Sequence, residues 1–112
     1  MGIRLEEIPF ELNGKEYRLR CNMNVLADVQ EQYDGDFISA LDDKRTTRSV
    51  LVFLAAMLND YADEKGWEER YTAKSLGRML RLNDIPVQKI MRMVVRSVMA
   101  EPSPSSPEEP GN

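Results

Sequence analysis

The sequence VLVFLAAML, residues 50–58, is the longest apolar run of this chain and decides its fold. Leu, Ala and Met favour the helix, and no Gly or Pro interrupts the run. It has no polar face, and a helix that is apolar on all sides is buried. The run is too short for a bilayer, which takes about 20 apolar residues. It therefore predicts a buried central helix, which we expect to begin at Thr46 or Thr47 and to end near Lys65.

The composition is that of an ordinary globular domain, with 30% charged and 42% hydrophobic residues in a chain of 112. Such a length can bury a core without disulfides or a metal. We expect residues 1–100 to form one domain and residues 101–112, rich in Pro, Ser and Glu, to form a disordered acidic tail. The single cysteine, Cys21, excludes an intrachain disulfide. The chain starts without a charged-then-apolar leader, so the expected location is the cytoplasm, without a membrane partner.

A β-hairpin is predicted for residues 8–21. Apolar residues alternate on both sides of Asn13-Gly14, a dipeptide that suits the positive φ angles of a type I′ turn. A two-residue loop places Phe10 opposite Tyr17 on one face of the ladder. Because an isolated hairpin is only marginally stable, this one must lie on the helices or pair with another chain through its free edge. Phe10 and Tyr17 are therefore candidates for a self-association edge.

Capping residues set the other boundaries. Residues 37–41 suggest one extra helical turn after the first helix. The expected fold class is α+β, mostly α, with an N-terminal β-hairpin followed by a bundle of about four to five helices around the buried central helix. The predicted boundary residues are Asn22 before a helix through Tyr33, Gly66 after the central helix, Thr72 before a short helix, and Pro86 at the start of the last one.

The last helix separates apolar from basic residues. At about 100° per residue, one face carries Val87, Ile90, Met91, Val94 and Val98, and the opposite face carries Lys89, Arg92 and Arg96. Met93 falls outside the apolar stripe, which favours an exposed position where its adaptable side chain contacts a partner. The alternative is that the methionines at helical spacing belong to the hydrophobic core. The candidate partner-binding surface consists of Met79, Lys89, Arg92, Met93 and Arg96.

No catalytic signature is present. His is absent, which removes the commonest general base and metal ligand. Cys21 lacks a base to activate it and is expected to be a small buried side chain. Asp34, Asp36 and the pair Asp42-Asp43 lack the spacing of a calcium loop and fit solvated turns. We therefore expect a protein that is not an enzyme and has no catalytic residue, no metal and no cofactor.

The charge pattern supports a second interpretation. Seven basic residues lie between Arg70 and Arg96 inclusive, and Asp84 is the only acid among them. Two basic helices joined by a turn are compatible with a small helix-turn-helix DNA-binding regulator. Against this, Gly77 lies inside the first helix rather than at the turn, and the second offers only Gln88 for reading bases. A nucleic-acid partner is therefore not favoured.

The order of these elements resembles the tail assembly chaperones of long-tailed phages and prophages. The resemblance covers roughly the first three quarters of the chain and consists of hairpin, cap and core patterns. It is carried by Phe10–Leu19 (FELNGKEYRL), Glu31–Phe37 (EQYDGDF), Leu54–Asn59 (LAAMLN) and Tyr71–Gly77 (YTAKSLG).

The resemblance implies a non-enzymatic protein of the host cell cytoplasm that is absent from the finished particle. Such a chaperone binds the tape measure protein, keeps its apolar helices soluble and helps to bring tail tube proteins to it. We expect copies to self-associate along this client. Many family members also have a longer, frameshifted form, and the family carries no active-site residues to transfer. A third interpretation is a minor structural component that stays in the virion.

Overall fold

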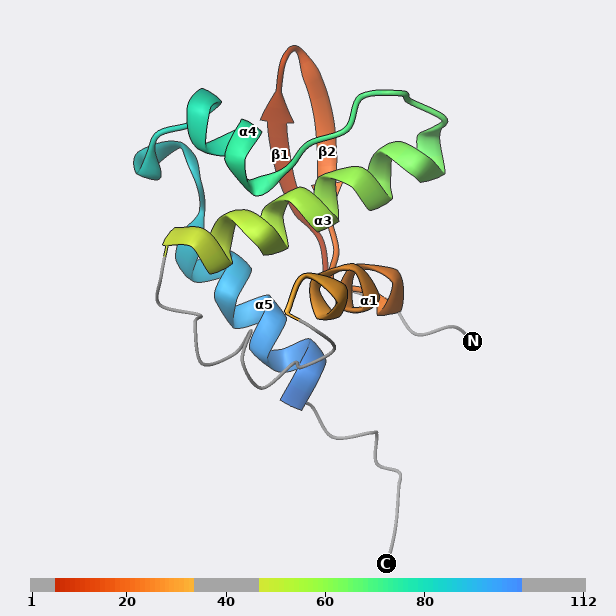
Figure 1. Cartoon of the computed structure of the whole chain (residues 1–112), viewed down its shortest axis with the longest axis vertical. Coiled ribbons are helices and arrows are strands. Elements are labelled where there is room, and N and C mark those ends of the chain that lie inside the picture. Colours follow the sequence, from red (N-terminus) through yellow and green to blue (C-terminus); the bar gives the residue numbers. More distant parts are fainter. Residues whose placement is uncertain (1–5, 34–46, 100–112) are drawn as a thin grey trace, which may run out of the picture.

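The computed structural model describes residues 6–33 and 47–99, and it has a mostly helical α+β fold. In Figure 1 the hairpin projects upward from the central helix α3, and α1 and α5 lie below it. Four elements, β2, α1, α4 and α5, pack against α3. The elements are β1 (Ile8–Leu12), β2 (Lys15–Leu19), α1 (Met23–Gln32), α3 (Thr47–Lys65), α4 (Ala73–Met79), the 3₁₀ helix η1 (Leu82–Asp84) and α5 (Val87–Met99).

The apolar run forms the middle of α3 and is buried, as predicted. Every side chain from Val52 to Leu58 belongs to the hydrophobic core, together with Tyr61 and Ala62 one turn further on. Only Leu51, near the beginning of the helix, is partly exposed within the run. A helix surrounded by other elements on most sides can be apolar all round, because no face of it has to meet water.

The end of α3 is also the predicted one. Gly66 has φ 77°, the left-handed conformation that glycine adopts without steric cost. The Trp67 N–H donates to the Ala62 carbonyl (2.8 Å), and the Gly66 N–H donates to the Asp63 carbonyl (3.2 Å). These two hydrogen bonds form a Schellman motif, which satisfies the last carbonyls of the helix. The turn sends Trp67 back toward the hairpin.

The hairpin has the predicted register. Asn13 and Gly14 have φ angles of 53° and 77°, and Phe10 faces Tyr17 across the ladder. The inward face of both strands is buried, and this face packs through β2 against α3. The first of the two expected arrangements, a hairpin lying on the helices, is therefore confirmed.

Side-chain caps fix the boundaries of the other helices. The Asn22 Oδ1 accepts the Val25 N–H (2.9 Å), and the Thr72 Oγ1 accepts the Ser75 N–H (3.0 Å), so both predicted N-caps are confirmed. Asn59 on α3 anchors the segment that precedes α4, because its side-chain amide makes two 2.8 Å hydrogen bonds with the backbone of Tyr71. These contacts join the segment after α3 to the core.

Several predictions fall beyond these ranges. The helical turn at residues 37–41 and the acidic tail at residues 101–112 lie outside the described residues. Within residues 6–33 and 47–99, none of the helices has the length and apolar character needed to cross a membrane.

Candidate functional site

The connection between α4 and α5 exposes apolar side chains. Within the described ranges, the large hydrophobic side chains with high exposure are Met23 (76%), Met79 (42%) and Leu82 (60%). Met79 is the last residue of α4, and Leu82 is the first of η1. Together with the basic residues beside them, Arg78 and Arg81, they form a surface that we call the α4–η1 patch.

The local fold explains why these apolar side chains remain outside. Leu76 is fully buried, and its carbonyl accepts the Leu80 N–H (2.9 Å) at the end of α4. Leu80 is then extended, with φ −117° and ψ 149°, so the chain leaves the helix direction. The 3₁₀ turn is closed by the Ile85 N–H, which donates to the Leu82 carbonyl (3.1 Å). Leu76 and Ile85 enter the core on either side, and the intervening turn stays at the surface.

The patch and its surroundings are basic. Arg96 pairs with Glu6 (2.8 Å), and Arg70 pairs with Asp63. The other five basic residues of this part of the chain are exposed, and none has a carboxylate of the described residues within ion-pair distance. These unpaired cations are Lys74, Arg78, Arg81, Lys89 and Arg92. Two of them, Arg78 and Arg81, are the immediate sequence neighbours of the exposed Met79 and Leu82, and they give the patch a positive border.

The candidate partner surface from the sequence is only partly retained. Met79, Lys89 and Arg92 are exposed, as that prediction requires, and Arg96 is exposed but has Glu6 as a partner. The prediction that Met93 is exposed is wrong, because its side chain is only 1% exposed.

The position of Met93 follows from how α5 packs. Ile90, Met93 and Val94 are buried, whereas Val87 and Met91 are only partly buried. The three buried residues have i, i+3 and i+4 spacing, which is one face of a helix. The buried face is therefore rotated from the middle of the apolar stripe toward Met93. Leu82 is absent from the surface predicted from the sequence, although its polar neighbours Arg81 and Asn83 favour an exposed position.

The predicted self-association edge is also corrected. Phe10 and Tyr17 are 7% and 0% exposed, so their side chains face the core and cannot contact a second chain. The Tyr17 ring lies edge-on to Trp67 (5.3 Å between centroids) and to Tyr71 (6.4 Å), and tilted to Tyr61 (6.0 Å). These rings join the hairpin to α3 and to the segment that follows it.

The free edge of β1 is interrupted as well. In a hairpin with a two-residue loop, Leu12 and Lys15 form a hydrogen-bonded pair, and so do Phe10 and Tyr17 two positions further on. The residues between them, Pro9 and Glu11, direct their backbone groups away from β2. Because Pro9 has no N–H, it removes a donor from this outer edge. A proline on an edge strand hinders pairing with another strand.

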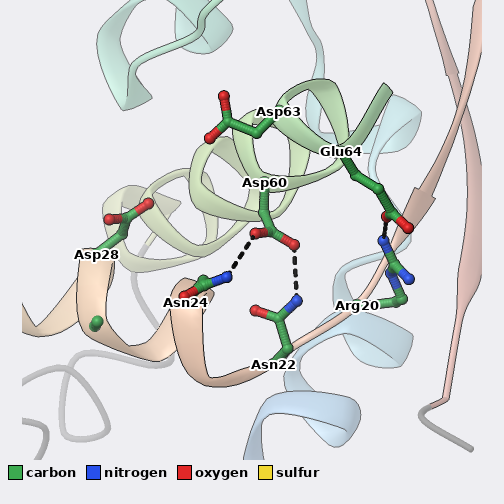
Figure 2. Close-up of a pocket in the computed structure, with 8 residues that line it drawn as sticks. Arg20, Asn22, Asn24, Asp28, Asp60, Asp63 and Glu64 are labelled. Carbon is green, nitrogen blue, oxygen red and sulfur yellow. Dashed lines mark hydrogen bonds and ion pairs between the residues drawn. The ribbon is translucent and has the colours of Figure 1, made fainter. Parts of the chain in front are cut away.

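A polar hollow of about 630 Å³ lies between the start of α1 and the end of α3 (Figure 2). The Asn22 amide donates to one oxygen of Asp60 (2.7 Å), and the Asn24 amide donates to the other (3.5 Å). Arg20 bonds to Glu64 across the same hollow. The lining residues are Arg20, Asn22, Asn24, Ala27, Asp28, Asp60, Asp63 and Glu64.

Three of the four carboxylates of this hollow have hydrogen-bond or ion-pair partners within the fold. Asp60 accepts two amides, Glu64 pairs with Arg20, and Asp63 pairs with Arg70. Among the described residues, no group of three or more His, Cys, Asp or Glu side chains is arranged to hold a metal ion. One signal of this cluster is present in the sequence, because Asp60, Asp63 and Glu64 share one face of α3. Nothing in the sequence indicates that Asn22 and Arg20 contact them.

Asp28→Asn is expected to stabilise the protein at neutral pH. Partial desolvation beside the hollow, followed by the charges of Glu31, Asp60 and Asp63, raises the pKa of Asp28 above its ordinary value of 3.8, although the residue is exposed at the surface. The folded state then binds the proton more tightly than the unfolded chain. Stability is therefore lost as the pH rises through the window between the ordinary and the raised pKa, and the amide avoids that loss. The measurement is the melting temperature of both proteins against pH.

The two melting curves should converge below the ordinary pKa, where both Asp28 and its Asn replacement are uncharged. Glu68→Gln is the matched control, because Glu68 is an exposed carboxylate outside the hollow. A gain in stability that is the same at neutral and at acid pH would contradict the explanation.

Cys21 has the environment expected of a structural side chain. It is buried, and burial raises the pKa of its thiol to about 11. At neutral pH it is therefore a thiol rather than the nucleophilic thiolate.

Comparison of the chain with protein-family models, with curated proteins and with solved structures gave no match.

Proposed function

We propose that this protein is a non-enzymatic phage tail assembly chaperone that works in the host cell cytoplasm. It binds the tape measure protein and keeps it soluble while tail tube subunits are recruited. The observation that carries the proposal is the α4–η1 patch, in which exposed Met79 and Leu82 lie beside Arg78 and Arg81, two cations without an ion-pair partner among residues 6–33 and 47–99. Adaptable apolar side chains with a charged border suit the recognition of amphipathic helices.

The size of the patch fits a weak contact that is repeated many times. Complete burial of one Met or Leu side chain is worth about 1.5–3 kcal/mol, and Met79 and Leu82 are already partly covered. After the entropic cost of association, two such side chains give only modest affinity. A long client can carry many similar helices, so many copies can bind along it. Weak individual contacts also allow the chaperone to leave when the tail is complete.

The proposed client surface differs from the one that the sequence suggested. Met93 supports the core, and its place in the surface is taken by Leu82, which lies in the turn before α5. Lys89 and Arg92 remain as exposed cations on α5. The binding surface is therefore centred on the connection between the last two helices rather than on the face of the last one.

Replacing Met79 and Leu82 together by Ser is expected to abolish client binding without unfolding the chain. Both side chains are exposed, so their loss should change the free energy of unfolding by about 0.5 kcal/mol or less each. The tagged protein is recovered from cells that are assembling phage, and co-purifying proteins are identified by mass spectrometry. A very long, helix-rich phage protein should accompany the wild type and be lost with the double variant.

Met23→Ser is the matched control, since Met23 is equally apolar and more exposed but lies at the start of α1. This variant should retain the client. Recovery of nuclease-sensitive DNA with the wild type, and no such protein, would instead favour the DNA-binding regulator. Presence of the protein in purified virions would favour a structural tail component.

A further inference from the structure

The charge around the α4–η1 patch is one-sided. Arg78 and Arg81 directly precede Met79 and Leu82 in the chain, and both are exposed. Asp84, the only acid in the stretch from Arg70 to Arg96, accepts the Arg81 backbone N–H through its Oδ2 (2.9 Å). An approaching ligand therefore meets guanidinium groups beside both exposed apolar side chains.

This positive border stands out against the rest of the molecule. The whole chain has a net charge of -4, and the hollow between α1 and α3 concentrates four carboxylates with one arginine. Among the described residues, the third large apolar side chain with high exposure is Met23, which lies next to Asn22 and Asn24 at the same end of α1 as that acidic hollow. Apolar exposure and positive charge coincide at the α4–η1 patch.

We infer that the segment bound at the α4–η1 patch is an amphipathic helix whose apolar stripe is bordered by Asp and Glu. This inference rests on the proposed function and specifies which client helices the protein selects. The apolar side chains exclude water from the contact. Carboxylates at its rim therefore pair with Arg78 and Arg81 where the charges are less screened than in bulk water. Guanidinium groups bind carboxylates through two parallel hydrogen bonds.

The same charges reject other helices. A client helix bordered by Lys and Arg places like charges against Arg78 and Arg81, and such repulsion gives specificity against that helix. The patch thus separates acidic from basic amphipathic helices, although both present the same apolar stripe to Met79 and Leu82.

Two synthetic helical peptides of about 20 residues test this selection. They share one Leu and Ala stripe, and their flanking positions carry Glu in one peptide and Lys in the other. Their dissociation constants with the full chain are measured by fluorescence anisotropy at low and at high salt. The Glu peptide should bind at least about tenfold more tightly, since each exposed pair contributes modestly and several act together. Salt should reduce the difference.

Charge reversal supplies the matched comparison. Arg78→Glu combined with Arg81→Glu should invert the preference, so that the Lys peptide binds more tightly. Lys65→Glu, a reversal at the last residue of α3, should leave the preference for the Glu peptide unchanged.

The outcomes separate this inference from the proposed function. Equal binding of both peptides, lost in both cases when Met79 and Leu82 are replaced by Ser, overturns the charge selection and leaves the client surface in place. Failure of both peptides to bind overturns the inference together with the surface. Tighter binding of a duplex DNA oligonucleotide than of the Glu peptide also overturns it, because the cations would then serve phosphates.

Discussion

Replacing Met93 by Asp is expected to unfold the protein. The Met93 side chain is 1% exposed and lies in the core cluster with Ile90 and Val94. An Asp in this place leaves either an unpaired charge or an unsatisfied carboxyl in an apolar environment, which costs several kcal/mol. A domain of this kind is stable by only about 5–15 kcal/mol, so the loss approaches the whole stability. Circular dichroism should show no cooperative melting transition, or one at a greatly reduced temperature.

Met79→Asp is the control for the same chemical change at an exposed position. Met79 is 42% exposed, so its replacement should leave the melting temperature within a few degrees of the wild type. If Met93→Asp melted like the wild type, the described packing of α5 would be wrong, and Met93 would return to the candidate partner surface.

Tyr17→Ala is the second substitution for which we expect a large effect. It is expected to lower the free energy of unfolding by about 3–5 kcal/mol, as for other large-to-small changes of buried aromatic residues. Tyr17 is completely buried, and its ring contacts Tyr61, Trp67 and Tyr71. Removing the ring leaves a cavity at the point where the hairpin meets α3. Urea denaturation followed by the fluorescence of Trp67, the only tryptophan, measures the loss.

Tyr17→Phe keeps the ring and removes only the hydroxyl, which lies 3.5 Å from the Tyr71 hydroxyl. At that distance the hydrogen bond is weak, so this variant should lose about 1 kcal/mol or less. Similar losses for Ala and Phe would mean that the hairpin does not depend on the aromatic contacts, and that the predicted role of Tyr17 at a free edge deserves a new test.

Local signals in the sequence were sufficient to predict the hairpin and the helix ends. Asn13-Gly14 favours one turn type, and a two-residue loop then determines every partner across the ladder. The caps at Asn22 and Thr72 and the left-handed Gly66 involve residues within five positions along the chain. Such features depend on nearby backbone geometry, so a single sequence contains the information that specifies them.

The candidate site was harder to predict because it depends on tertiary packing. Periodicity gives the direction of an apolar stripe, but successive residues on a helix are about 100° apart, so a modest rotation of α5 moves Met93 from the surface into the core. The exposure of Leu82 depends on Leu76 and Ile85 entering the core on either side of η1. The hollow joins Asn22 to Asp60, which lie far apart in the sequence and meet only when α1 packs on α3.

The most direct measurement of the central claim is site-specific photo-crosslinking in cells that are assembling phage. A photoreactive amino acid is placed at Leu82 in one variant and at Met23 in another, both of which are strongly exposed. The account predicts that position 82 crosslinks to a very long, helix-rich tail protein and that position 23 does not. Crosslinks to that protein from position 23 but not from position 82 would show that the client binds elsewhere and would contradict the account.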